Sequence, residues 1–168
     1  MKSIPLTPMP DAPADHFDVS ALLLKQPSKH RWAKSSWRLL GIVPGLSDSE
    51  IETAQQQGEI ITLTSLRLQL YRQFCESYYV NLTAKKTKVY LVCRDNDQAI
   101  QPVLLTVDFD EAASYMEAGE KVFDAPLPDV LCVWLEHFVV AHYELQPPKK
   151  RRRKRWHEND PEADNAKQ

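Results

Sequence analysis

The chain of 168 residues is long enough for one domain with a real core but short for two. Apolar residues make up 43% and charged residues 26%, which is typical of a soluble globular protein. The net charge of −2 hides a division, because residues 1–148 carry 13 Lys and Arg against 19 Asp and Glu. This acidic body disfavours a dedicated reader of nucleic acid, whose surface would be basic.

The two ends of the chain differ from the middle. Residues 1–14 contain four prolines and little apolar material, which indicates a flexible N-terminal segment. Near the other end, seven consecutive basic residues occupy positions 149–155, directly after two prolines. We therefore expect a single domain over 15–146 and a disordered tail over 147–168, first basic and then acidic.

Targeting and redox signals are weak throughout the sequence. No segment approaches the roughly 18–20 apolar residues of a membrane span, and the N-terminus lacks the apolar core of a signal peptide. Cys75, Cys93 and Cys132 are widely spaced and odd in number, so no disulfide framework suggests itself. We expect a reduced, cytoplasmic protein without a membrane span.

Apolar alternation predicts five strands. They are expected over 17–24, 36–43, 60–71, 87–94 and 102–108. Within the third, the apolar positions change from odd to even numbers, which predicts a bulge near Thr64 and Ser65. Pro102 has no backbone donor and must lie at a strand start or on an edge strand.

Helical patterns occur at four places in the chain. They are expected over 47–57, 74–81, 110–118 and 128–144. Asp108, Asp110 and Glu111 precede or begin the third of these, and we expect them to cap it rather than form a catalytic acid pair. Strands first and helices later predict an α+β fold, with an antiparallel sheet of about five strands, two or three helices on one face and a long C-terminal helix.

The C-terminal helix carries two apolar faces. One face holds Leu127, Leu131, Trp134, Phe138, Ala141 and Leu145. We expect Trp37, Leu131, Trp134 and Phe138 to be structural core residues, with Trp134 the largest buried side chain of the helix. Val133 and Val140 point the other way, and Tyr143 lies between the faces. Either other segments cover this second side, or it binds a partner.

Residues that could support chemistry do not form a known constellation. His137 and His142 are five residues apart, whereas two zinc ligands on one helix are spaced by three or four. Cys93 lies on an alternating strand and is best interpreted as a buried apolar group. The sequence contains no glycine-rich phosphate loop and no nucleophile elbow. We expect no catalytic residues, no metal and no cofactor.

An ordered series of modest motifs resembles a known family. The series is Trp37-Arg38-Leu39, Val43-Pro44-Gly45, Tyr79, Asn81-Leu82, Val89-Tyr90-Leu91-Val92, Arg94, Pro102-Val103-Leu104-Leu105-Thr106, Glu111-Ala112, Gly119-Glu120, Pro126, Pro128, Trp134, Phe138 and His142, followed by the basic run. Over roughly residues 17–155 the chain resembles a family of small bacterial proteins of unknown function, typically encoded beside molybdenum-dependent formate dehydrogenases and their accessory proteins. The resemblance implies an accessory role for such an enzyme and brings no catalytic residues.

Three functions are compatible with these observations. The first is a non-enzymatic interaction protein, with a formate dehydrogenase subunit or an accessory protein as partner. The second is a protein that binds nucleic acid weakly and in a salt-sensitive way through its tail, and the third is a small enzyme of an unrecognised type. The expected partner-binding residues are Val133, Val140, Tyr143, Lys149, Lys150, Arg151, Arg152, Arg153, Lys154 and Arg155.

Overall fold

A computed structural model describes residues 13–29, 31, 35–45, 49–50, 53, 59–96 and 99–144. In chain order its elements are β1 (His16–Pro27), β2 (Ser35–Pro44), β3 (Ile60–Gln69), the 3-10 helix η1 (Arg72–Phe74), α2 (Cys75–Thr83), β4 (Lys88–Asn96), β5 (Ala99–Thr106), α3 (Phe109–Glu117), β6 (Lys121–Pro126) and α4 (Asp129–His142). The predicted α+β class is confirmed. The helix expected over 47–57 lies mostly outside the described residues.

The strands form two antiparallel sheets of three strands each, in the orders β2-β1-β3 and β5-β4-β6. The expectation of one sheet of about five strands is wrong. β3 pairs only with β1, and the chain then passes through η1 and α2 before β4 begins the second sheet. β6 was not expected, because only Ala125 among its six residues is fully buried and its apolar alternation is weak.

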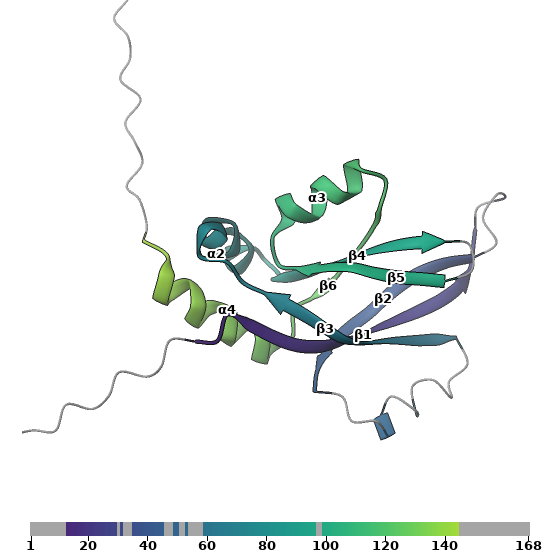
Figure 1. Ribbon diagram of the computed structural model, residues 1–168, viewed down its shortest axis with the longest axis horizontal. Helices are drawn as coiled ribbons and strands as arrows, with labels where there is room; N and C mark the ends of the chain where they lie inside the picture. The colour runs from purple at the N-terminus through teal and green to yellow at the C-terminus, as the bar shows by residue number, and fades with distance from the viewer. Residues whose placement is uncertain are drawn as a thin grey trace, which may run out of the picture.

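The two sheets enclose a common core. β2 lies beside β6 and β3 lies beside β5, so the sheets approach one another along both edges (Figure 1). Alternate residues of the two central strands point into this space. They are Val19, Ala21 and Leu23 from β1 and Val89, Leu91 and Cys93 from β4.

A bulge in β3 explains the change of apolar phase. Val19 pairs with Leu66 while Ala21 pairs with Leu63, so two residues of β3 oppose one residue of β1. The extra residue belongs to the Thr64–Ser65 pair, and Ser65 adopts φ = 58°. The predicted bulge is therefore confirmed, and it lets Leu66 and Leu68 return to the core face.

Pro102 and Asp108 also occupy the places expected from their chemistry. Pro102 lies on the edge strand β5, opposite Cys93, where the register shifts. The Asp108 carboxylate accepts hydrogen bonds from the backbone N–H groups of Asp110, at 2.9 Å, and Glu111, at 3.4 Å. Asp108 therefore caps α3, as predicted.

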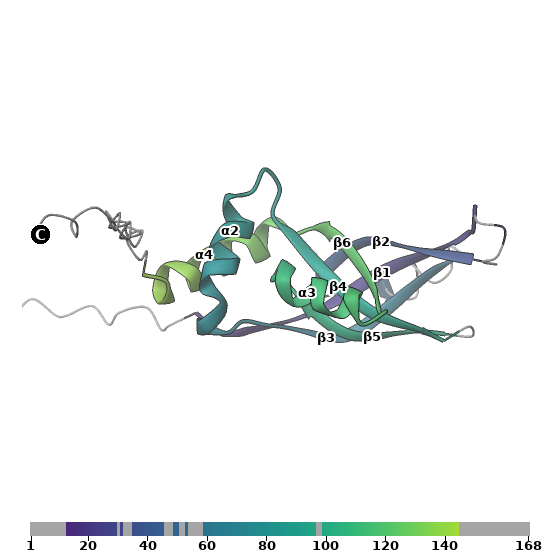
Figure 2. The same cartoon turned by 90° about the horizontal axis from the view of Figure 1, so that it is seen from above.

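The helices do not share one face of a sheet, contrary to expectation. α3 covers the outer face of β5-β4-β6, and α2 and α4 pack on one another at one end of the sheets (Figures 1 and 2). Buried Val92 points away from the common core, toward the side that α3 and its buried Ala112 cover. Both faces of the second sheet are thus protected, whereas α4 keeps a side turned to solvent.

The depth of burial along α4 differs from the sequence-based expectation. Leu131, Leu135 and Phe138 are buried, and Phe138 is the largest buried side chain of the helix. Trp134 is only partly buried. Its ring lies beside Phe17, with centroids 5.5 Å apart, and its indole N–H donates to the Ala14 carbonyl at 2.7 Å. The Trp134 side chain thus fastens the start of the described chain to α4.

Two more residues expected in the core lie at its border. Ala141 is exposed, since α4 is near its end and only Phe138 and Val139 of the last turns reach the core. Trp37 packs partly buried against the core, with the Lys25 ammonium 5.5 Å from its ring centroid. Leu145 lies outside the described residues.

Truncating Phe138 should destabilise the protein more than truncating Trp134. Phe138 is 2% exposed, so Phe138→Ala should lower the free energy of unfolding by about 3–5 kcal/mol. Trp134→Ala removes a partly exposed ring and one hydrogen bond, and should cost less than half as much. Urea denaturation of the two variants measures both values, and an equal or larger loss for Trp134→Ala would contradict the burial described here.

Candidate functional site

Buried polar contacts fix the position of α2. The side-chain amide of Asn81 donates to the carbonyls of Lys88 and Val107, each at 2.8 Å, and its oxygen accepts from the Lys88 N–H at 3.0 Å. Asn81 is almost fully buried, so these bonds also satisfy backbone groups that would otherwise lack partners. One side chain therefore ties α2 to the start of β4 and the end of β5.

Aromatic packing then holds α4 against α2. Tyr78 is buried, and its ring meets that of Phe138 edge-on at 6.4 Å between centroids. Its hydroxyl accepts from the Tyr71 N–H at 3.2 Å, and burial raises the pKa of Tyr78 well above its usual range. Further along, the rings of Tyr79 and Tyr143 lie 5.4 Å apart. Two aromatic pairs thus join the helices.

Beside these pairs, an open groove separates α2 from α4. Its volume is about 410 Å³. Its lining residues are Tyr79, Leu82, Thr83, Thr87, Cys132, Val133, Glu136, Val139 and Val140. Most of these side chains are apolar, two are threonines, and Glu136 is the charged member. The groove, which we call the α2–α4 groove, is suited to apolar side chains from another molecule.

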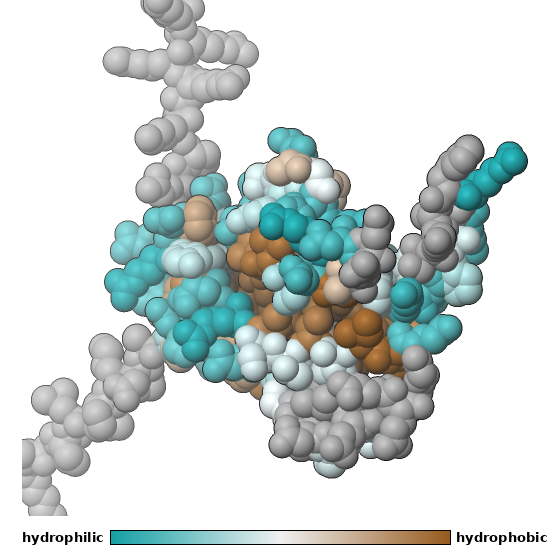
Figure 3. Space-filling view, turned by 45° about the vertical axis from the view of Figure 1, so that its right-hand side comes forward, coloured by the Kyte–Doolittle hydropathy of each residue, from teal (hydrophilic) through white to brown (hydrophobic). Residues whose placement is uncertain are grey.

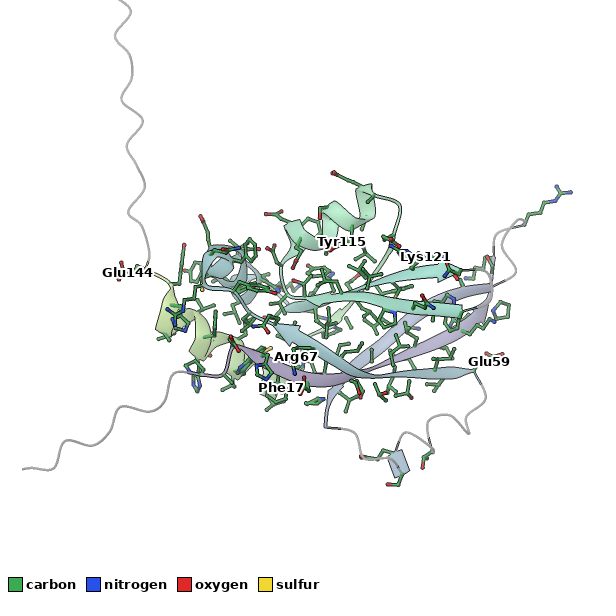
Figure 4. The ribbon with its side chains drawn as sticks, viewed as in Figure 1. Phe17, Glu59, Arg67, Tyr115, Lys121 and Glu144 are labelled. Carbon is green, nitrogen blue, oxygen red and sulfur yellow. The ribbon has the colours of Figure 1, made fainter. Side chains whose placement is uncertain are left out.

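One wall of this groove continues into the solvent-facing side of α4. The α4 outer face consists of the exposed residues Asp129, Val130, Val133, Glu136, His137, Val140, Ala141 and Glu144. Within the described part of the chain, Val130, Val133 and Val140 are 54%, 51% and 77% exposed. Figure 4 shows Glu144 at the outer end of α4, away from the sheets. Three exposed valines on one helix form an apolar surface that lacks a cover among these residues.

The charged residues that line the α2–α4 groove and the hollow next to it are mainly acidic. A second hollow of about 620 Å³ shares Val140 with the groove, and Glu76, Glu144 and Arg72 are among its other lining residues. Together with Glu136, the two hollows present three carboxylates and one guanidinium. From Asp129 to Glu144 the chain contains no Lys or Arg. The α4 outer face is therefore both apolar and acidic.

A separate cleft of about 760 Å³ lies between α2 and the start of α3. Phe74, Val80 and Phe109 supply apolar surface, and the Ser77 hydroxyl donates to the Asp108 carboxylate at 2.6 Å. This hydroxyl faces a carboxylate that is already occupied as the cap of α3. The cleft is also lined by Glu76 and Asp110, but no histidine is among its lining residues. The pair of Ser77 and Asp108 is accounted for as a structural link between α2 and α3.

The metal and thiol candidates are also accounted for structurally. Among the described residues, no group of three or more His, Cys, Asp or Glu side chains could hold a metal ion. His142 packs edge-on against Phe138 at 4.6 Å, whereas His137 is exposed. Cys93 is buried, and burial raises the pKa of its thiol to about 12. No helix in the described ranges is long and apolar enough to cross a membrane.

The structure brings the expected partner-binding residues together only in part. Val133 and Val140 both line the α2–α4 groove and are exposed. Tyr143 is half-buried against Tyr79, so one side of its ring is engaged within the molecule. The basic residues at 149–155 lie outside the described residues. Leu131 and Phe138 lie in the core.

Sequence reasoning missed several members of this surface. Val130 lies three residues before Val133, and that spacing was available as a signal. Leu82, Cys132 and the threonines of the groove could not be assigned from sequence, because their role depends on α2 lying beside α4.

Apolar side chains also gather over the strands (Figure 3). The exposed large apolar residues of the strands are Leu40, Ile61 and Val103, each less exposed than the three valines of α4.

The fold and this surface define a small α+β protein that presents an apolar, acidic helix face beside a groove. The chain belongs to the family DUF3305, described as a protein of unknown function, whose pattern it matches over residues 18–153. No curated protein and no solved structure matches the chain. Within the described part of the chain, the family match covers α2, α3, α4, the α2–α4 groove and both sheets except the first two residues of β1.

Thiol labelling provides a direct test of the groove. Cys132 is partly exposed in the groove, whereas Cys75 and Cys93 are buried, so a maleimide should modify Cys132 first in the folded protein. Burial raises the pKa of the Cys132 thiol, so its thiolate fraction at pH 7 is below that of a free thiol and labelling should accelerate as the pH rises. Mass spectrometry of digested protein identifies the site. Cys132→Ser should leave the folded protein almost unlabelled, and equal labelling of all three cysteines would contradict this arrangement.

Proposed function

We propose that this protein acts by binding another protein through the α4 outer face and the α2–α4 groove. The observation that carries the proposal is the exposure of Val130, Val133 and Val140 on a helix whose other side is in the core. Leaving three valines in water forgoes hydrophobic stabilisation, and a docking partner would recover it. The groove beside them offers room for anchoring side chains, as in many helix-binding proteins.

A role without catalysis is consistent with the polar contacts of the described residues. Their strongest candidates for chemistry, Ser77 with Asp108 and the two histidines of α4, all have structural partners or lie apart. Asn81 and Tyr78, the most buried polar side chains of α2, serve to hold the helix in place. We therefore infer that the protein works as an accessory or interaction protein rather than as an enzyme.

We further propose that the partner is a subunit of a molybdenum-dependent formate dehydrogenase or one of its accessory proteins. Support comes from the resemblance carried by the ordered motifs between Trp37 and His142. Two of those motif residues, Tyr79 and Leu82 on α2, line the α2–α4 groove, and a third, Phe138, packs α4 against α2 from the core. Such an accessory protein would influence maturation or activity of the enzyme through contact alone.

Charged substitutions on the outer face test this proposal. Val133→Asp combined with Val140→Asp should keep the fold, because surface substitutions usually change stability by less than about 0.5 kcal/mol. The double variant of the full chain should lose capture of a formate dehydrogenase subunit or accessory protein from nuclease-treated native extract, with the captured protein identified by mass spectrometry.

Val103→Asp is the matched control, since Val103 is an exposed valine on β5. Capture of the same identified protein by the wild type, the control and the double variant alike would reject this surface as its docking site. Unfolding of the double variant would mean that the two valines are core residues. Reduced formate oxidation after deletion of the gene would connect the captured partner to a cellular effect.

Nucleic acid is the second candidate ligand, favoured by the seven basic residues at 149–155. About four to six phosphate contacts would make log K fall with log salt at a slope of about −4 to −5. We expect this binding to be sequence-blind, negligible at physiological salt and lost on removal of residues 149–168. Fluorescence anisotropy with two unrelated DNA duplexes over a salt series measures it. Sequence-specific binding that persists at about 0.2 M salt would promote this function over protein docking.

A further inference from the structure

We propose that the occupant of the α4 outer face is an amphipathic helix of a partner protein, with an apolar stripe flanked by lysine or arginine residues. This inference rests on the proposed docking function of the same surface and adds the chemistry of the partner. It is carried by the spacing of the exposed residues on α4, by the adjoining groove and by the sign of the surrounding charge.

The spacing of the outer-face residues suits a helical partner. Val130, Val133, His137 and Val140 are separated by three, four and three residues, the repeat with which one helix packs along another. All four are exposed along α4, whose 14 residues span about 21 Å. In an extended strand, side chains on one face recur at every second residue, so a partner strand would not match the spacing of three, four and three residues on α4. We call the row formed by Val130, Val133, His137 and Val140 the seam, and a partner helix of about four turns would cover it.

The α2–α4 groove supplies a place for anchoring side chains. Val133 and Val140 belong to both the seam and the groove wall, so a helix lying on the seam borders the groove. Partly buried Cys132 and buried Val139 also line the groove and provide apolar contact. Leucine or phenylalanine side chains on one flank of the partner helix would enter it, as in other helix-in-groove complexes.

The surrounding charge selects the polar residues of the partner. Glu136 lines the groove, and Glu76 and Glu144 line the adjoining hollow, with Arg72 as its basic member. Lysine or arginine beside the apolar stripe would therefore meet carboxylates. Two copies of the outer face would instead bring carboxylates against carboxylates, which costs binding energy. The charge thus favours a basic partner over a second copy of this chain.

The basic run of this chain is a weaker candidate for the same surface. It begins at Lys149, five residues after Glu144, and so lies within about 17 Å of chain. Its seven residues could meet the carboxylates, but none of them is apolar. They would leave Val133 and Val140 uncovered, whereas an amphipathic partner helix satisfies both the charge and the apolar seam.

Two synthetic helical peptides of the same length test the proposal against the full-length protein. Both carry leucines at the spacing of the seam, and their flanking positions are lysine in one and glutamate in the other. By fluorescence anisotropy at physiological salt, the lysine-flanked peptide should bind at least tenfold more tightly. The double variant Val133→Asn, Val140→Asn should weaken binding of this peptide about tenfold or more, while Val103→Asn on β5 should leave its binding unchanged.

A charge variant separates the two parts of the recognition. Glu136→Gln should weaken binding of the lysine-flanked peptide severalfold and strengthen binding of the glutamate-flanked peptide. The thermal melt should change little. Equal binding of both peptides, still lost in the double valine variant, would overturn the preference for a basic helix and leave the docking surface standing. If the double valine variant binds either peptide as tightly as the wild type does, that result would count against the docking surface itself.

Two further measurements examine the competing occupants. Arg151→Ala, Arg152→Ala and Arg153→Ala in one chain should leave the affinity for the lysine-flanked peptide within a factor of two. A gain of tenfold or more would show that the chain's own basic run occupies the surface, and would overturn the proposal. Sedimentation should show no dimer that depends on Val133 and Val140, and such a dimer would assign the surface to a second copy.

Discussion

The edge-on packing of Tyr78 against Phe138 holds α2 against α4, and the candidate interaction surface depends on it. Both rings are buried, and Asn81 fastens the same helix to two strands. With α4 held on this side, its opposite side has to face outward. The α2–α4 groove then forms where the two helices separate beyond their contact. The candidate surface is thus a consequence of core packing, since the core residues set the direction in which the valines point.

The α4 helix satisfies two requirements that usually conflict. Its inner side supplies Leu131, Leu135 and Phe138 to the core, while its outer side exposes valines among carboxylates. An apolar outer side would normally favour aggregation. Acidic residues oppose that tendency, because like charges repel copies of the protein, whereas a basic partner of the proposed kind would be attracted. This combination of apolar and acidic residues supports the proposal of a basic, amphipathic partner.

Much of the local structure was predictable because local chemistry decides it. The bulge at Ser65 followed from a change in apolar phase, and the Asp108 cap followed from acidic residues ahead of an apolar helix. The edge position of Pro102 followed from its missing N–H. β6 escaped notice because six residues with one fully buried side chain leave little periodic signal. Trp134 was expected deep in the core, yet it serves to fasten Ala14 and to pack on Phe17.

The candidate surface shows the same division between local and distant causes. By itself the sequence determined that α4 has two apolar faces, that the body is acidic and that Val133 and Val140 point away from Phe138. These properties depend only on residue type and on the 3.6-residue period of a helix. Only the tertiary structure decided that six strands form two sheets, that Phe138 rather than Trp134 is buried, and that α2 lies beside α4 to make a groove. Periodicity sets the direction of a side chain about its own helix or strand, whereas the element that lies opposite is chosen by the packing of the whole chain.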